Sequence, residues 1–227
     1  MTDPDQYKMV LFDLDGTLVD SVPDLAWCGD EMMRQLGLPA RGIESARCWV
    51  GNGVERFVKR FLTNSMLDEP PTELFDRGFQ LFDRLYTDNV CQYSELYEGV
   101  LEGLESLKKA GLHLACVTNK AERFSTRLVG EIGLKQYFNL VVSGDTTSQK
   151  KPHPMPLLFA AKHYSCSPAD CLMVGDSSND VAAARAAGFA VACVPYGYNH
   201  GEDIADSNPD FIIESINQLP SILEPKK

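Results

Sequence analysis

Two aspartates stand two residues apart directly after a short apolar run near the start of the chain. The run 9–12 is rich in strand formers and too short for a helix, which predicts a buried strand that ends before Asp13. Extended backbone turns residues two apart to the same side, so Asp13 and Asp15 can point together. Gly16 then allows a sharp turn. Like charges held this close repel each other unless a cation lies between them.

A divalent cation is one remedy for this repulsion. Mg²⁺ prefers oxygen ligands, and proteins commonly hold it with one or two carboxylates together with a substrate phosphate. The pair of aspartates therefore predicts Mg²⁺ as a cofactor. A solvated turn, in which an aspartate caps its own backbone, is the alternative for an isolated Asp-x-Asp pattern, and the surrounding chain has to decide.

Further along, amphipathic helices alternate with short apolar strands. The helices are expected at 100–110, 121–132, 154–161 and 181–187, and the strands at 112–117, 140–142, 171–174 and 190–194, with 211–213 as an edge strand. Such alternation predicts right-handed βαβ units around a parallel sheet that is covered on both faces. The expected fold is α/β, a three-layer Rossmann-like core with a central parallel sheet.

Ligands of such sheets bind beyond the carboxyl ends of the strands. The polar residues that follow the predicted strands, or lie shortly after them, are Asp13, Asp15, Thr118, Asn119, Lys151, Asp176 and Asp180. A hydroxyl and an amide suit phosphoryl oxygens, although Thr118 and Asn119 could also cap the next helix. Asp180 stands where an ordinary helix cap would stand. Four acids at one edge would otherwise be unneutralised, which favours a metal site.

The first strand is separated from the others by a mostly helical stretch. Helices are expected at about 20–37, 53–62 and 72–86, with a loop at 47–53. We expect residues 18–92 to form a small inserted α-helical cap above the same sheet edge, on a core made of residues 1–17 and 93–227. In the loop, the candidates for contact with the non-phosphate end of a substrate are Arg47, Trp49, Gly51 and Asn52, which could equally just support the loop.

Composition narrows the classes of partner. With 21 basic and 32 acidic residues the net charge is −11, the wrong sign for a nucleic-acid or anionic-membrane binder. The seven cysteines contain no Cys-x-x-Cys pair and are expected to be reduced core thiols. The first five residues lack a basic start and a long apolar stretch. We expect a cytoplasmic monomer or homodimer that acts on a small molecule and binds neither nucleic acid nor membrane.

Four segments resemble, in order, the motifs of haloacid dehalogenase-type phosphatases. They are Asp-Leu-Asp-Gly-Thr-Leu-Val-Asp-Ser at 13–21, the strand ending in Thr118-Asn119, Lys-Pro-His-Pro at 151–154, and Gly-Asp-Ser-Ser-Asn-Asp at 175–180. The resemblance covers nearly the whole chain and implies a Rossmann-like core with a small inserted cap. Shorter motifs at 117–120, 143–146, 150–154 and 197–201 look like those of bacterial phosphoglycolate phosphatases.

The resemblance implies a role for each site residue. Asp13 is expected to attack phosphorus, forming an aspartyl-phosphate, and to bind Mg²⁺. Asp15 is expected to be the general acid and base, with its backbone carbonyl on the metal. The expected phosphate-binding residues are Thr118, Asn119 and Lys151; Lys151 is preferred to the adjacent Lys150 because it directly precedes the proline of the motif. Asp176 is expected to bind Mg²⁺ directly, and Asp180 through water or by orienting another ligand.

These inferences predict a Mg²⁺-dependent phosphomonoester hydrolase for a small phosphorylated metabolite, with 2-phosphoglycolate as the first candidate. Asp15 is a second acid that carbon–halogen displacement does not need, which disfavours a dehalogenase. The alternatives are a β-phosphoglucomutase-like phosphomutase, a phosphatase for another sugar phosphate or for pyrophosphate, and, last, a catalytically silent binding protein on the same scaffold.

Overall fold

The computed structural model describes residues 7–223, at whose centre lies a six-stranded sheet. Residues 1–6 and 224–227 lie outside the described part. They include the N-terminal segment and the two ends of the core that we expected at 1–17 and 93–227. The strands of the sheet are β1 (Met9–Phe12), β4 (His113–Val117), β5 (Leu140–Val142), β6 (Cys171–Gly175), β7 (Ala190–Cys193) and β8 (Phe211–Ile212).

The strands of this sheet run parallel in the order β5-β4-β1-β6-β7-β8. In the central strand β1, Met9 lies opposite His113 of β4 and Cys171 of β6. Every residue of β1 is buried, which explains its unbroken apolar sequence. The predicted central parallel sheet is confirmed, and β8 is the edge strand that the run 211–213 indicated.

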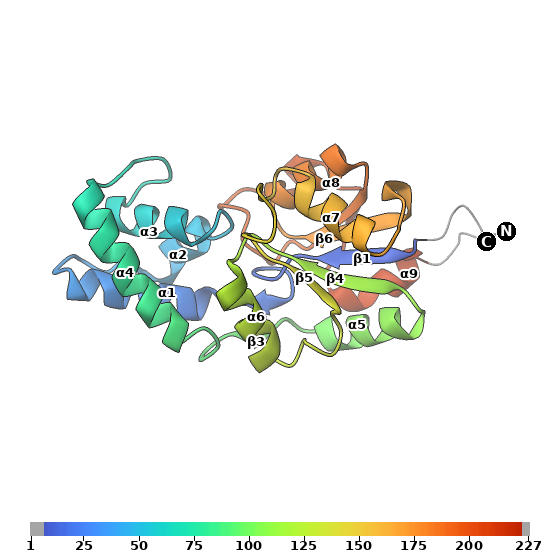
Figure 1. Ribbon diagram of the computed structural model, residues 1–227, viewed down its shortest axis with the longest axis horizontal. Coiled ribbons are helices and arrows are strands. Elements are labelled where there is room, and N and C mark those ends of the chain that lie inside the picture. Colours follow the sequence, from blue (N-terminus) through green and yellow to red (C-terminus); the bar gives the residue numbers. More distant parts are fainter. Residues whose placement is uncertain (1–6, 224–227) are drawn as a thin grey trace.

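Helices cover both faces of the sheet, so the core has the three layers that were expected (Figure 1). Side chains alternate along a strand, and accordingly Val10 and Phe12 lie in one hydrophobic cluster while Met9 and Leu11 lie in another. Helices α5 (Val100–Lys109), α6 (Glu122–Glu131) and α9 (Leu219–Leu223) pack on the first face, and α7 (Met155–His163) and α8 (Ser178–Ala187) on the second. Short 3-10 helices span Pro168–Asp170, Ile204–Ser207 and Ile216–Gln218.

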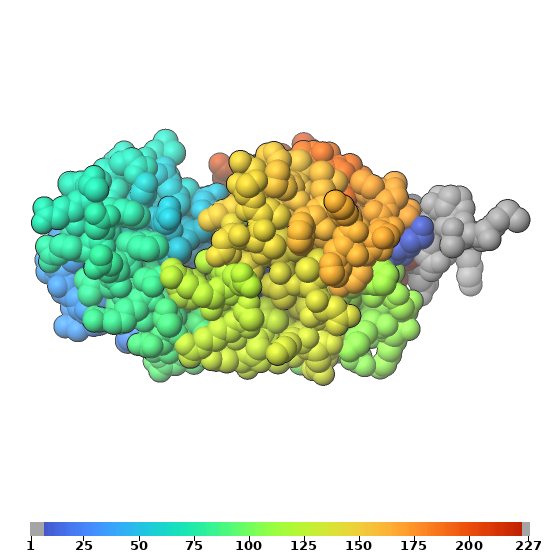
Figure 2. All heavy atoms as spheres, viewed as in Figure 1, coloured from blue at the N-terminus to red at the C-terminus, as the bar shows by residue number. Residues whose placement is uncertain are grey.

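A block of helices lies beyond the carboxyl ends of the strands (Figure 1), and the space-filling view shows it as a lobe at the left (Figure 2). It consists of α1 (Val22–Gln35), α2 (Gly42–Trp49), α3 (Val54–Thr63) and α4 (Thr72–Asp88). Its interior is aromatic: the ring of Phe57 lies 4.9 Å from that of Phe61 and 5.5 Å from that of Phe82. Burying one such ring contributes roughly 1.5–3 kcal/mol, so these contacts hold the four helices together.

The helical block differs from the expectation in two places. We expected a loop at 47–53, but Arg47 and Trp49 belong to α2, which leaves residues 50–53 as the loop. Helix α2 buries only Ala46 and Trp49, which is too short an apolar stripe to be recognised as a helix. The chain also forms an antiparallel ribbon of β2 (Val19–Asp20) and β3 (Glu95–Leu96), whose two-residue strands are below the length that a periodic pattern can reveal.

Between residues 7 and 223, no helix combines the length and the apolar character that crossing a bilayer would require.

Candidate active site

Asp13 is the first residue after β1, at the edge of the sheet that faces the helical block. Its N–H donates a hydrogen bond of 2.9 Å to the carbonyl of Val174, so the backbone still follows the sheet where the carboxylate begins. Three residues later, Gly16 has a φ of +87°, and a Cβ at this position would lie 2.3 Å from Oδ2 of Asp176. This turn therefore needs glycine both for its backbone conformation and for its close approach to Asp176.

The carboxylates of Asp13, Asp176 and Asp180 each offer an oxygen atom within 4.8 Å of the others. Oδ1 of Asp176 accepts a hydrogen bond of 2.7 Å from Thr17, and Oδ2 accepts one of 2.6 Å from the N–H of Tyr198. Burial raises the pKa of Asp13 to about 7, and burial together with the charge of Asp13 raises the pKa of Asp176 well above its ordinary value. A hard cation would relieve this cost, so the all-oxygen cluster fits Mg²⁺.

Lys151 places an ammonium group inside this acidic cluster. Its Nζ lies 2.9 Å from Oδ1 of Asp13 and 2.7 Å from Oδ1 of Asp180, and donates to the carbonyl of Val117 at 2.7 Å. Burial alone would lower the pKa of Lys151, but the charges of Asp13 and Asp180 raise it above its ordinary value. The buried lysine therefore stays protonated and offsets part of the negative charge.

Asp180 closes the capping box at the start of α8. Its Oδ2 accepts hydrogen bonds from the hydroxyl of Ser177 at 2.7 Å and from the N–H of Ser177 at 3.1 Å. Its Oδ1 accepts from Lys151. Asp180 therefore holds Lys151 and the start of α8 in place, whichever ligands surround a metal ion.

Asp15 turns toward the helical block. Its Oδ1 accepts a hydrogen bond of 2.6 Å from Ser21, and its two oxygens lie 3.0 and 3.2 Å from Nζ of Lys120. The same Nζ lies 2.5 Å from the hydroxyl of Tyr86 in α4. Among the described residues, the carboxylate of Asp15 does not join the cluster of Asp13. The carboxylate of Asp15 thus faces Lys120 and the cap instead of the acidic cluster.

Thr118 and Asn119 follow β4 at the same edge, as predicted. The hydroxyl oxygen of Thr118 accepts a hydrogen bond of 3.1 Å from the N–H of Lys120, and its own proton remains to be donated. The amide nitrogen of Asn119 donates to the carbonyls of Gly51 and Lys151, each at 2.9 Å. Both of its protons are thus engaged, so the expected contact of this amide with phosphate is corrected: it joins the cap loop to the backbone of Lys151.

Two of the four cap candidates lie in the loop that follows α2. Gly51 lines a cavity together with Asp13 and Asp15. Asn52 accepts a hydrogen bond of 2.8 Å from Arg60, so its side chain supports the loop and lines only the outer groove described below.

The other two cap candidates belong to α2 and do not line that cavity. Trp49 is buried edge-on against the ring of Phe61, with 5.1 Å between the ring centroids. Arg47 lies at the base of the cap, where its guanidinium is 3.6 Å from Asp20. The expectation that Arg47 and Trp49 belong to a loop is therefore corrected, and their contacts agree with the supporting role that was the alternative for them.

The cavity between the sheet edge and the helical block has a volume of about 50 Å³. Its walls combine the polar Asp13, Asp15, Thr118 and Lys120 with the apolar Leu25, Val50, Val54, Phe57 and Phe124. A water molecule needs about 10–15 Å³ measured in this way, so the cavity has room for roughly four water-sized groups. Outside it, an open groove of about 930 Å³ shares Gly53, Val54 and Ala121 with the cavity wall.

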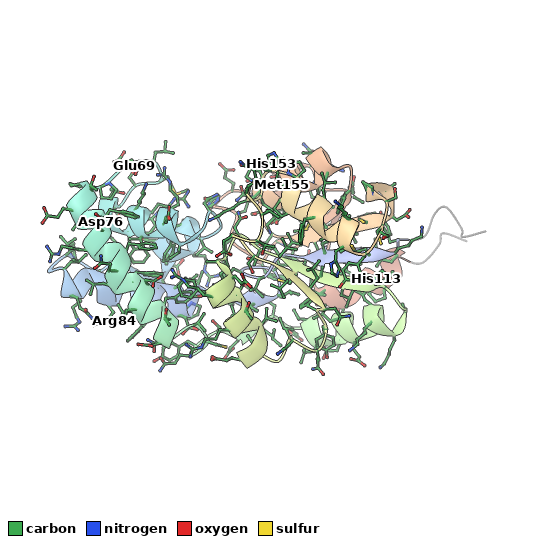
Figure 3. The ribbon with its side chains drawn as sticks, viewed as in Figure 1. Glu69, Asp76, Arg84, His113, His153 and Met155 are labelled. Atoms are coloured by element: carbon green, nitrogen blue, oxygen red, sulfur yellow. The ribbon has the colours of Figure 1, made fainter. Side chains whose placement is uncertain are left out.

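His153 follows Lys151 by two residues but takes no part in the cavity. It is exposed, and its Nδ1 accepts a hydrogen bond of 3.2 Å from the N–H of Met155. Figure 3 shows both side chains at the outer surface of the core, near the start of α7. The proline-rich motif therefore contributes its lysine to the site, and its histidine to the surface.

The site thus brings the carboxylates of Asp13 and Asp15 to the wall of one small cavity, and the buried ammonium group of Lys151 contacts Asp13. Such a set can attack an electrophilic centre, compensate negative charge and transfer a proton.

Two residues of this region were not identified as site residues from the sequence. Lys120 lines the cavity beside Asp15, and Tyr198 fixes Asp176 through its backbone. The position of Lys120, directly after Thr118 and Asn119 at a strand end, was a usable signal. Tyr198 lies in the motif at 197–201, but the type of its side chain gave no signal for this contact, which uses a backbone N–H that every residue except proline has.

Comparison with known proteins identifies relatives over almost the entire chain. Residues 10–194 match the model of the family described as haloacid dehalogenase-like hydrolase. A phosphoglycolate phosphatase of Nitrosococcus oceani is 53% identical over 218 residues, which are 96% of this chain and 97% of that protein. A phosphoglycolate phosphatase of Thiobacillus denitrificans is 46% identical over 209 residues, 92% of each chain.

A solved structure agrees with these relatives. The crystal structure of a predicted phosphoglycolate phosphatase from Haemophilus somnus has a TM-score of 0.91 to this chain at 33% sequence identity, covering 99% of this chain and 100% of its own. The family model alone spans well over half of the residues. By its sequence and its fold, the chain belongs to the haloacid dehalogenase-like hydrolase family.

Proposed function

We propose that the protein is a Mg²⁺-dependent phosphatase that hydrolyses 2-phosphoglycolate to glycolate and phosphate through an aspartyl-phosphate. The observation that carries the proposal is the cluster of Asp13, Asp176 and Asp180, whose carboxylate oxygens lie within 4.8 Å of one another at the sheet edge. The phosphoglycolate phosphatases to which the chain is similar over most of its length support the choice of substrate.

In this proposal Asp13 is the nucleophile. One of its oxygens attacks phosphorus, and the bond from phosphorus to the ester oxygen breaks as Asp15 donates a proton to the leaving alkoxide. Water then attacks the phosphorus of the aspartyl-phosphate while Asp15 accepts its proton, which releases inorganic phosphate and restores Asp13. Thr118 donates to a phosphoryl oxygen.

The other residues hold this arrangement in place. Lys151 compensates the charge of Asp13 and of the phosphoryl group, and Asp180 and Asn119 orient Lys151 through the contacts described above. Mg²⁺, held by Asp13, Asp176 and the backbone carbonyl of Asp15, would supply positive charge that lets an anionic nucleophile approach a dianionic phosphate.

The proposal includes a division of the chain. Residues 18–92 form the inserted cap and residues 1–17 and 93–227 the catalytic core, of which the structure describes 7–17 and 93–223. The packing of α1 to α4 against one another supports this division, as does the ribbon in which Val19 pairs with Leu96 at the base of the block. Seven free cysteines fit a reducing compartment, and we place the enzyme in the cytoplasm.

The size of the cavity bears on the choice among substrates. At about 50 Å³ it suits the two-carbon part of phosphoglycolate, whereas a hexose would require the cap to move away from the core. This observation favours hydrolysis of a small ester over isomerisation of a hexose phosphate.

The test is a phosphate-release screen with MgCl₂ over 2-phosphoglycolate, several hexose phosphates and pyrophosphate. We expect the highest kcat/KM for 2-phosphoglycolate. Conversion of a hexose phosphate to its isomer without phosphate release would instead identify a mutase. No turnover of any ester, with the protein folded, would overturn the proposal in favour of a binding protein.

A further inference from the structure

The small cavity has one chemically distinctive position at its cap side. The walls there are mostly apolar and are formed by Leu25, Val50, Val54 and Phe57. Lys120 also lines the cavity, and its ammonium group contacts Asp15. Lys120 is buried, with 7% of its surface exposed. Burying an ammonium group is costly unless anions are close, and here Asp15 supplies one.

The ammonium group of Lys120 has fewer separate partners than that of Lys151. Its Nζ lies 3.0 and 3.2 Å from the two oxygens of Asp15 and 2.5 Å from the hydroxyl of Tyr86. A lysine ammonium has three N–H donors, so when one N–H is shared between the two oxygens of Asp15, a third N–H remains for another acceptor. By contrast, Lys151 meets Asp13, Asp180 and the carbonyl of Val117, which engages all three of its donors. Among the described residues that line the cavity, Lys120 is the cation, and it can still bind an anion.

We propose that Lys120 binds the carboxylate of the substrate and thereby selects short phosphate monoesters that carry a carboxylate. The inference rests on the proposed function and assigns its specificity to this side chain. In the proposed function the phosphate binds at the acidic cluster, where Mg²⁺ would compensate its charge. The carboxylate of the same short ester then needs a nearby cationic partner of its own. Lys120 provides it on the far side of Asp15, where Tyr86 of the cap holds the ammonium in place.

Tyr86 gives this recognition a link to the cap. It comes from α4, whereas Lys120 follows β4 of the core, so the hydrogen bond between them crosses from cap to core. A carboxylate that joins Lys120 would therefore be bound at the interface of the two, in the space that the apolar walls limit to a few atoms. Longer esters lack room, and neutral short esters leave the third donor of Lys120 unpaired.

The experiment compares two substrates that differ only in this group. 2-Phosphoglycolate and ethyl phosphate have the same chain length, with a methyl group in place of the carboxylate in the second. For Lys120→Met we expect the ratio of the two kcat/KM values to fall at least tenfold relative to the wild-type protein. Tyr86→Phe, which keeps the charge, should lower the same ratio about threefold, because the ammonium loses one of its fixed partners. Circular dichroism checks that each variant folds.

The outcome separates recognition from a merely structural role. If Lys120 served only to position Asp15, both substrates would lose activity alike and the ratio would stay at its wild-type value, which would overturn the inference. A wild-type protein that cleaves ethyl phosphate but not 2-phosphoglycolate would instead refute the proposed function. Binding of glycolate, measured by calorimetry, gives a second readout without turnover: Lys120→Met should weaken it at least tenfold, and unchanged binding would contradict the inference.

Discussion

The backbone N–H of Tyr198 donates a hydrogen bond of 2.6 Å to Oδ2 of Asp176. The phenol of the same residue donates to Asp20 at the base of the cap, and its ring lies 5.3 Å from the guanidinium carbon of Arg47. One residue therefore contacts both the acidic cluster and the segment where the chain passes into the cap. The close approach depends on the preceding residue being glycine.

Gly197→Ala should weaken Mg²⁺ binding. A Cβ at Gly197 would lie 2.2 Å from Cβ of Asp176, so either this backbone or the carboxylate must move. We expect the Mg²⁺ dissociation constant, measured by calorimetry, to rise at least tenfold. Gly130→Ala is the matched control, because a Cβ there meets nothing within 4 Å and alanine favours a helix by up to about 1 kcal/mol. Equal affinities in the two variants would contradict the assignment of Asp176 as a ligand.

Asp13→Asn should abolish turnover without unfolding the protein. The amide cannot form the aspartyl-phosphate, and we expect kcat to fall by about a thousandfold or more. Removing one of several like charges should leave the melting temperature unchanged or higher, since burial raises the pKa of Asp13 to about 7 and thus makes its ionised form costly. Phosphate release within tenfold of the wild-type rate would exclude Asp13 as the nucleophile.

Lys151→Met should destabilise the protein, because it leaves Asp13 and Asp180 without their buried cation. Breaking a buried ion pair by removing one partner costs about 3–5 kcal/mol of unfolding free energy. Urea unfolding in the presence of EDTA measures this loss. The adjacent Lys150 is exposed, and Lys150→Met should change the unfolding free energy by less than about 0.5 kcal/mol. Similar unfolding midpoints for both variants would refute the role given to Lys151.

Stabilisation by Mg²⁺ should increase with pH. The pKa of Asp13 is raised from 3.8 to about 7, so the folded state holds this proton more tightly than the unfolded chain. The stability that Asp13 contributes is therefore complete below about pH 3.8 and is lost as the pH rises through 7. Burial raises the pKa of Asp176 as well, which acts in the same direction. A cation favours both carboxylates and should reverse the loss.

Thermal unfolding with MgCl₂ and with EDTA at two pH values measures this effect. We expect Mg²⁺ to raise the melting temperature more at pH 8 than at pH 5, where protons compete with the ion. An equal shift at both values would show that the ion binds elsewhere.

The sheet and the edge at which the polar residues gather could be predicted because their signals are local. The run 9–12 and the other strands are continuous apolar stretches, and the sheet-edge rule then places Asp13, Asp15, Thr118, Lys151 and Asp176 together without any knowledge of side-chain positions. Asp180 also lies at this edge. Its carboxylate caps the start of α8, which is the alternative role that its place in the sequence allowed.

What could not be predicted depends on contacts between distant parts of the chain. Lys120 and Asp15 are 105 residues apart, and their pairing follows only once β1 and β4 are neighbours. The amide of Asn119 suits either a phosphate or a carbonyl, and its choice of Gly51 depends on where the cap lies. Helix α2 is stabilised by packing against α1 and α3 more than by its own pattern, so its existence is a tertiary effect.

The ribbon of β2 and β3 makes the two crossing points of the cap neighbours in space, with Val19 opposite Leu96 and Asp20 opposite Glu95. The chain therefore enters and leaves the helical block at neighbouring positions. We expect that another helical segment can replace the residues between these points without changing the pairing of β1 with β4 and β6. The selectivity of this scaffold can therefore diversify independently of its phosphoryl chemistry.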